Sequence, residues 1–192
     1  MKYIYLAIAI LLVIVGLVIM GQKAEAPTNE LNVINGQNNT NMSDLTLTSN
    51  SFENNGVIPS KYTCDGENIN PQLSIEGVPE SAESLVLIMD DPDAIKPAGK
   101  VWDHWIVFNI PPTTESIPEG VEPEGIHGTG TANNTDYSGP CPPDAEHSYI
   151  FKLYALDTEL DLGKGVSKSE VESAMEGHIL RETRLIGRYE RQ

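Results

Sequence analysis

Two short segments of this chain are apolar at consecutive positions, and this pattern limits the possible folds more than any other feature. Residues 84–89 read SLVLIM and residues 106–110 read IVFNI. A strand with one solvated face alternates apolar and polar residues, whereas a strand covered on both faces does not. We therefore expect both segments to be central strands of a sheet that is buried on its two faces.

The other regular elements predicted from the sequence are also mostly strands. One helix is expected after Ser167, which forms a capping box with Glu170, and Val171 and Met175 share one face of that helix. The fold class is therefore mainly β, of the α+β type, with few short helices and one helix packed on the sheet. Four more segments rich in β-branched or aromatic residues lie between turn residues, at 45–47, 72–75, 149–156 and 183–189.

The N-terminus is predicted to place the chain at a membrane. Lys2 precedes an apolar run over residues 3–20, close to the roughly 17–25 residues that span a bilayer and longer than the roughly 7–15 of a secretory leader. An uncleaved transmembrane helix is favoured, with cleavage near residues 24–26 as the alternative. Because Lys2 keeps the N-terminus in the cytoplasm, we expect a single-pass membrane protein whose domain faces outside the cytoplasm, or a secreted domain if the leader is cleaved.

Three regions follow from this pattern. Residues 1–22 form the anchor or signal segment, and residues 45–192 form one domain of ordinary size. Between them, residues 23–44 are rich in Asn and contain too few apolar groups to fold, so we expect a flexible linker.

The net charge of −16 excludes nucleic acid as a partner, because phosphate-backbone binding requires a basic face. The segment 111–138 shows no periodicity, and a loop of this length in a compact domain is more often functional than accidental. The same segment contains His127, which has no obvious partner. Four glutamates in the segment are interpreted as a solvated face: Glu115, Glu119, Glu122 and Glu124.

Polar residues adjoin three of the expected strands. They occur in the blocks DDPD at 90–93, WDHW at 102–105 and PCPPDAEHSY at 140–149. Because all three blocks could meet at the rim of one sheet, we expect them to form the wall of one pocket. For Asp91, Pro92 and Asp93 a plain strand-ending turn is the alternative.

Cys64 and Cys141 are the two cysteines of the chain. Outside the cytoplasm an isolated pair more often forms a disulfide than performs chemistry, so we predict that they are bonded. The alternative is a thiol nucleophile at Cys141 assisted by His104 or His147. The two interpretations exclude each other, because an oxidised cysteine has no thiolate.

Catalytic motifs and metal sites have little support in this sequence. It contains neither a Gly-x-Ser-x-Gly motif nor a phosphate-binding P-loop. A metal site built from Asp90, Asp91, Asp93 and two histidines is conceivable, yet the spacing matches no calcium loop and lacks the tight His pair of zinc hydrolases. We therefore predict no metal, no cofactor and no enzymatic activity.

Five ordered blocks resemble the phosphatidylethanolamine-binding protein family, in its short prokaryotic branch often called Raf kinase inhibitor-like. The match extends over residues 45–191, and it implies a β-sandwich of two antiparallel sheets with a small anion-binding cavity at one end. The blocks are TCDGENINPQL, LIMDDPDA, WDHWIVFNIP, YSGPCPPDAEHSYIFKLYAL and GHILRETRLIGRYER.

By this resemblance the cavity holds a small anionic or zwitterionic ligand such as a phospholipid head group. Two histidines and a tyrosine hydroxyl supply directional donors, and backbone N–H groups of the loop around Cys141 face the anion. Asp91 fixes the tautomer of a neighbouring imidazole or binds an ammonium group of the ligand. The resemblance places ligand contacts on Asp91, His104, Cys141, Pro142, His147 and Tyr149, framed by Pro92, Asp93, Trp102 and Pro143.

One position departs from the family pattern. Many members carry arginine between the last histidine and tyrosine of the block, where this chain has Ser148. On an alternating strand Ser148 points away from His147 and Tyr149, so the departure puts in doubt a supporting salt bridge to the DDPD block rather than a ligand contact.

Two functions of different classes remain open. The first is a binding module for a phosphate-bearing or similar small anion at the membrane surface. The second is a protein-interaction module, because the family includes inhibitors of serine proteases and kinases. A secreted protease would then meet the exposed segment 111–138.

Overall fold

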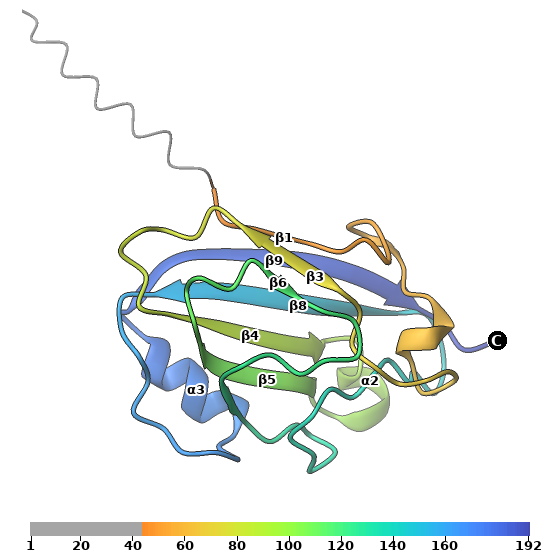
Figure 1. Cartoon of the computed structure of the whole chain (residues 1–192). Helices are drawn as coiled ribbons and strands as arrows, with labels where there is room; N and C mark the ends of the chain where they lie inside the picture. Colours follow the sequence, from red (N-terminus) through yellow and green to blue (C-terminus); the bar gives the residue numbers. More distant parts are fainter. Residues whose placement is uncertain (1–43) are drawn as a thin grey trace, which may run out of the picture. The chain divides into compact units, whose positions relative to one another are not determined.

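The computed structural model describes residues 44–192 and arranges them as two β-sheets with three short helices (Figure 1). The smaller sheet has the order β1-β3-β6, with β1 at Thr46–Thr48, β3 at Leu73–Glu76 and β6 at Ser116–Ile117. The larger sheet has the order β2-β9-β8-β4-β5-β7. Its strands are β2 (Gly56–Val57), β9 (Ile179–Tyr189), β8 (His147–Leu156), β4 (Ser84–Asp91), β5 (Trp102–Ile110) and β7 (Ile126–His127).

All six predicted strands are present, and the structure adds the two-residue strands β2, β6 and β7. The pairing is antiparallel throughout except between β2 and β9, which run parallel. The expectation of two antiparallel sheets is therefore wrong at this one edge. Strands of two residues carry no periodicity, so the sequence pattern did not indicate them.

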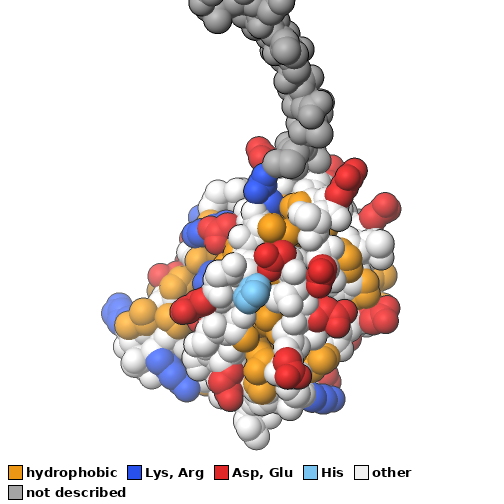
Figure 2. Space-filling view, turned by 90° about the vertical axis from the view of Figure 1, so that its left-hand side faces the viewer, with side chains coloured by type: hydrophobic (Ala, Val, Ile, Leu, Met, Phe, Trp, Pro, Cys, Tyr) orange, Lys and Arg blue, Asp and Glu red, His pale blue; other side chains and the backbone are white. Residues whose placement is uncertain are grey.

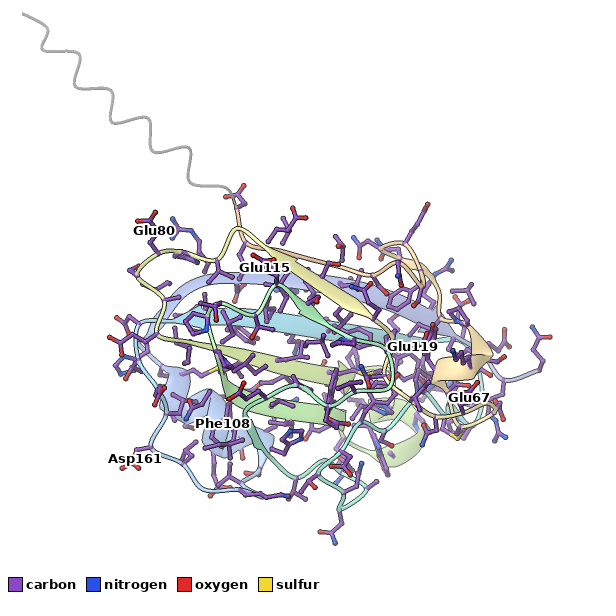
Figure 3. All side chains as sticks on the ribbon, in the orientation of Figure 1. Glu67, Glu80, Phe108, Glu115, Glu119 and Asp161 are labelled. Atoms are coloured by element: carbon purple, nitrogen blue, oxygen red, sulfur yellow. A yellow bond between two sulfur atoms is a disulfide. The ribbon has the colours of Figure 1, made fainter. Side chains whose placement is uncertain are left out.

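Apolar side chains cover both faces of β4, as its sequence predicted. Leu87 and Met89 belong to the core between the two sheets, whereas Val86 and Ile88 belong to a second core on the opposite face. In that second core Phe108 of β5 joins the buried side of α3 (Figure 3). The continuous apolar run thus reflects a strand buried on its two sides.

The predicted helix is α3 (Lys168–Met175), and its capping box is present. The Ser167 hydroxyl accepts from the Glu170 N–H, and the Glu170 carboxylate accepts from the Ser167 N–H. Two shorter helices, η2 (Ser60–Tyr62) and α2 (Ile95–Ala98), lie at the end of the sandwich opposite α3 (Figure 1).

The predicted anchor at 1–22 lies outside the described residues, as does the linker at 23–44 apart from its last residue. Within residues 44–192, no helix is long and apolar enough to span a bilayer.

Acidic side chains are spread over the face seen in Figure 2, yet two glutamates of the segment 111–138 are bound to the fold. Glu119 pairs with Lys61 and accepts from the Tyr62 hydroxyl beside η2 (Figure 3). Glu122 accepts from the Trp105 indole at 2.8 Å and from the Tyr137 N–H at 2.8 Å. Glu119 is nonetheless exposed, as the interpretation of this cluster as a solvated face predicted, whereas the interpretation is wrong for the half-buried Glu122. Both residues help to hold the long segment in place.

His127 also has partners, contrary to the expectation from sequence. Its Nδ1 lies 3.1 Å from the Thr135 carbonyl, and its Nε2 lies 3.4 Å from the Pro123 carbonyl. Backbone groups of the same segment provide these contacts, and the sequence pattern gives no sign of them.

Candidate functional site

A β-bulge sets the orientation of His104. Along the β4–β5 ladder Met89 pairs with Trp105, while the next residue, Asp90, pairs with Asp103. His104 therefore has no partner across the ladder and is the extra residue of a bulge. Bulges bend a strand and redirect a side chain, and this one lets His104 line a cavity beside residues that alternate onto the core face.

The strand alternation of β8 and β4 supplies the facing side chains. His147 and Tyr149 alternate with half-buried positions and lie on the face of β8 that carries Phe151 of the central core. Asp91 likewise follows Met89 by two residues on β4. These polar side chains therefore lie on the same interior faces as the apolar core, at the end of the sandwich beyond the last core residues.

A cavity of about 300 Å³ occupies this end of the sandwich, near α2 (Figure 1). All six predicted ligand contacts line it, as do the frame residues Trp102 and Pro143. The WDHW block and the first half of the DDPD block lie inside strands, because β4 and β5 stay paired through residues 90–91 and 102–103. Most of the third block, residues 140–146, precedes β8. Residues that the sequence did not indicate also line the wall: Ala94, Pro97, Ala98, Ala132, Ser138 and Gly139.

The Asp91 carboxylate has two structural roles at once. Its Oδ1 accepts from the backbone N–H groups of Asp93 at 2.9 Å and Ala94 at 3.1 Å, which is the turn interpretation. Its Oδ2 accepts from His147 Nδ1 at 2.6 Å, which is the imidazole-orienting interpretation. The Asp91 side chain therefore both forms the strand-ending turn and orients an imidazole, the two roles that the sequence offered as alternatives.

His147 lies between two carboxylates, and the second of them was not predicted. Its Nε2 donates to Asp144 Oδ1 at 3.0 Å, three residues earlier in the chain. Burial lowers the pKa of His147, but the hydrogen bonds and charges of Asp91 and Asp144 outweigh burial, and the net pKa is raised. With both ring nitrogens donating, His147 is held as an imidazolium whose N–H groups are already used.

His104 has the opposite electrostatic environment. Its Nδ1 lies 2.7 Å from the Ser138 carbonyl, and its Nε2 has no hydrogen-bond partner among the described residues. Burial lowers the pKa of this imidazole, and the Ser138 carbonyl and the Asp91 charge offset only part of that effect. His104 is therefore the neutral histidine of the cavity.

The Tyr149 hydroxyl is a buried polar group without a hydrogen-bond partner in residues 44–192. Burial raises the pKa of this phenol, an effect that the nearby Cys141 backbone N–H partly offsets. Its ring packs edge-on against His104, with centroids 5.3 Å apart. An unpartnered buried hydroxyl is costly, and at a cavity wall it marks a position where a ligand atom would be bound.

The predicted Cys64–Cys141 disulfide is present and anchors the proline-rich wall of the cavity. The Cys64 N–H donates to the Pro140 carbonyl, and the Gly139 N–H donates to Asn68 Oδ1. A Cβ at Gly139 would lie 2.3 Å from the Tyr62 carbonyl oxygen, so only glycine permits this close approach.

The expected set of backbone donors in this loop is smaller than the sequence suggested. Three of the four residues at 140–143 are prolines and have no N–H. The Ser138 and Gly139 N–H groups already donate to His104 and Asn68. Residues 138–143 therefore retain one further N–H, that of Cys141, which lies beside the Tyr149 hydroxyl.

Pro92 and Asp93 were expected to frame the cavity but do not line it. Asp93 points away, and its Oδ2 accepts from the Ser148 backbone N–H at 2.8 Å. The absence of an arginine at position 148 put in doubt a salt bridge between the DDPD block and β8. In this chain the backbone N–H of Ser148 connects the two instead. No group of three or more His, Cys, Asp or Glu side chains within residues 44–192 is arranged to hold a metal ion.

The two histidines should titrate in opposite directions from the ordinary histidine pKa of about 6.5. We expect His147 to titrate above this value and His104 below it in a pH titration of the ring proton NMR signals. The stability that His147 contributes is present below pH 6.5 and lost as the pH rises through its raised pKa. The contribution of neutral His104 is present above pH 6.5 and lost as the pH falls. The reverse order of titration would contradict the hydrogen-bond assignment.

The sequence model of the family described as phosphatidylethanolamine-binding protein matches residues 48–190. The chain belongs to this family. A UPF0098 protein of Methanothermobacter thermautotrophicus is 52% identical over 77% of this chain and 99% of its own length. This phosphatidylethanolamine-binding protein fold is also found in two solved structures that match 78% of the chain.

The first solved relative, described as the putative phosphatidylethanolamine-binding protein homologue CT736 of Chlamydia trachomatis, is 43% identical with a TM-score of 0.74, and 99% of its chain is covered. The second, E. coli YbcL, described as a new member of the mammalian family, is 28% identical with a TM-score of 0.72 and is covered completely. The mainly β fold of the phosphatidylethanolamine-binding protein family is therefore established for this chain.

Proposed function

We propose that this protein is a non-catalytic binding protein whose cavity takes a small molecule through a phosphate or similar anionic group. The observation that supports this most is the buried Tyr149 hydroxyl, which has no partner among the described residues and lies at the cavity wall beside His104 and Cys141. A hydroxyl and a backbone N–H that converge on one space are suited to anion oxygens.

The residues that line the cavity also indicate the chemistry of the rest of the ligand. Apolar side chains of α2 and the prolines of residues 142–143 line it together with Trp102. A ligand with a small apolar part next to its anionic group would fill this space better than a free inorganic ion. A phospholipid head group and a soluble phosphate ester both meet this description.

The proposed location is the outer surface of a membrane. The apolar run at residues 3–20 supports an N-terminal anchor, and a disulfide fits an oxidising compartment outside the cytoplasm. A domain tethered there would meet head groups or soluble phosphate esters rather than cytoplasmic partners.

Inhibition of a secreted serine protease is the alternative proposed from the sequence. Its candidate contact, the segment 111–138, is bound to the domain through β6, β7, Glu119 and Glu122. No specific feature of this segment favours protease binding, so the small-molecule proposal is preferred.

An NMR titration with phosphoethanolamine tests the proposal. We expect millimolar ligand to shift the ring signals of His104 and Tyr149 in the full chain, with a much smaller change at His178, which lies exposed beside Asp157 and serves as an internal control. Tyr149→Phe should weaken the affinity about 5- to 10-fold, because it removes one hydrogen bond worth about 1 kcal/mol. Unchanged His104 and Tyr149 signals at saturating ligand would overturn the proposal.

A further inference from the structure

The hydrogen bond to Ser138 fixes where the His104 ring carries its proton. A backbone carbonyl can only accept, so the Nδ1 that lies 2.7 Å from it must donate. In the neutral ring the second nitrogen, Nε2, is then an acceptor with a free lone pair. The buried His104 ring, which lines the cavity, therefore offers a ligand an acceptor and not a donor.

An anion without a proton also presents only acceptors, so it would place oxygen against the Nε2 lone pair. Charging His104 would remove the conflict, and Asp91 and Asp90 of β4 and Asp103 of β5 favour the charged ring. Burial opposes it and outweighs them. A proton brought by the ligand avoids this cost.

His147 does not replace the missing donor. Its two N–H groups are used by Asp91 and Asp144, so it can donate to a ligand only if Asp144 moves away. The Tyr149 hydroxyl, from the same strand, donates equally well to any anion. His104 is therefore the residue at which a protonated and an unprotonated anion differ.

We infer that the cavity selects phosphate monoesters over sulfate esters and phosphodiesters, because a monoester monoanion keeps one P–O–H that donates to His104 Nε2. Sulfate esters and phosphodiesters have no such proton near neutral pH. His104 is thus a specificity-determining residue, because its Nε2 accepts a hydrogen bond only from a ligand that carries a proton. This inference rests on the proposed anion-binding function and narrows its ligand class to phosphate monoesters, so it favours a soluble phosphate ester over the head group of an intact phospholipid, which is a phosphodiester.

Calorimetry with methyl phosphate, methyl sulfate and dimethyl phosphate on the full chain tests it. At about pH 5, where the monoester is mostly the monoanion, we expect methyl phosphate to bind roughly 100-fold more tightly than the other two, the cost of one unmatched buried acceptor. The number of protons taken up on binding is measured by repeating the titration in buffers of different ionisation enthalpy. We expect about one proton at about pH 8, where the free monoester is a dianion because its second pKa is about 6. At about pH 5, where the free monoester already carries the proton, we expect almost none.

Two variants separate His104 from the rest of the cavity. The amide of His104→Gln can donate to an unprotonated anion, so it should reduce the preference for methyl phosphate at least tenfold and abolish proton uptake. Tyr149→Phe is the matched control and should weaken all three ligands alike while the preference persists. If His104→Gln does not fold, the wild type still decides, because a proton placed on His104 would give uptake with all three ligands, whereas a proton placed on the ligand gives uptake with methyl phosphate alone.

Each outcome has a definite meaning. Similar affinities for the three ligands at about pH 5, without proton uptake at about pH 8, would overturn the inference and leave the anion-binding proposal intact. Proton uptake that persists in His104→Gln would assign the proton to another group and overturn the role of His104. Absence of binding by all three ligands and by phosphoethanolamine would overturn the proposed function together with the inference.

Discussion

Replacing Asp91 by alanine should lower the free energy of unfolding by about 3–5 kcal/mol. Asp91 is 3% exposed, so the substitution leaves a buried imidazolium without its closer carboxylate, which accepts from His147 Nδ1 at 2.6 Å. It also leaves the N–H groups of Asp93 and Ala94 without their acceptor. Urea unfolding at about pH 6, where His147 is charged, measures the loss.

The neighbouring Asp93→Ala is the matched control. Asp93 is exposed and accepts a single hydrogen bond from the Ser148 N–H, so we expect a loss of about 1 kcal/mol or less. In Asp91→Asn the pKa of His147 should fall, because the amide carries no charge to stabilise the imidazolium. Equal losses of unfolding free energy for Asp91→Ala and Asp93→Ala would contradict the claim that Asp91 stabilises both the turn and the charged His147.

Removing the disulfide with the double substitution Cys64→Ala and Cys141→Ala should cost about 4 kcal/mol. The bond joins residues 77 apart in sequence, and closing a loop of that length restricts the unfolded chain strongly. Urea unfolding of the wild type with and without reductant should give the same difference. A loss below about 1 kcal/mol would show that other contacts already fix the two segments.

The same double substitution should weaken ligand binding less than it weakens the fold. Hydrogen bonds from Cys64 to Pro140, from Gly139 to Asn68 and from Tyr137 to Tyr62 still hold the loop near its place. We expect an affinity loss for methyl phosphate of roughly 3- to 10-fold, since the loop becomes less preordered. Unchanged affinity would show that the cavity wall at Cys141 does not contribute to ligand binding.

The two central strands of the larger sheet, β4 and β5, could be predicted because burial on two faces leaves a direct mark on sequence. Residues 84–89 and 106–110 are apolar except at Ser84 and Asn109, and the structure covers both sides of each. Helix α2 could not be predicted, because four residues make barely one turn and show no period. Its side chains nonetheless form part of the cavity wall.

The residues that line the cavity could be anticipated from the resemblance, but their protonation could not. The orientation of His104 depends on a bulge, and its tautomer depends on the carbonyl of Ser138, 34 residues away in sequence. The partner of His147 Nε2 is Asp144, a residue of the PCPPDAEHSY block with no distinctive pattern. Hydrogen bonds of this kind become visible only once distant segments are placed together.

A crystal structure of the protein soaked with phosphoethanolamine tests the central claim most directly. We expect the phosphorus to lie in the cavity, with one ligand oxygen within hydrogen-bond distance of His104 Nε2 and another within hydrogen-bond distance of the Tyr149 hydroxyl. A ligand bound elsewhere at saturating concentration, or a hydrocarbon chain filling the cavity without contact to these two groups, would contradict the account.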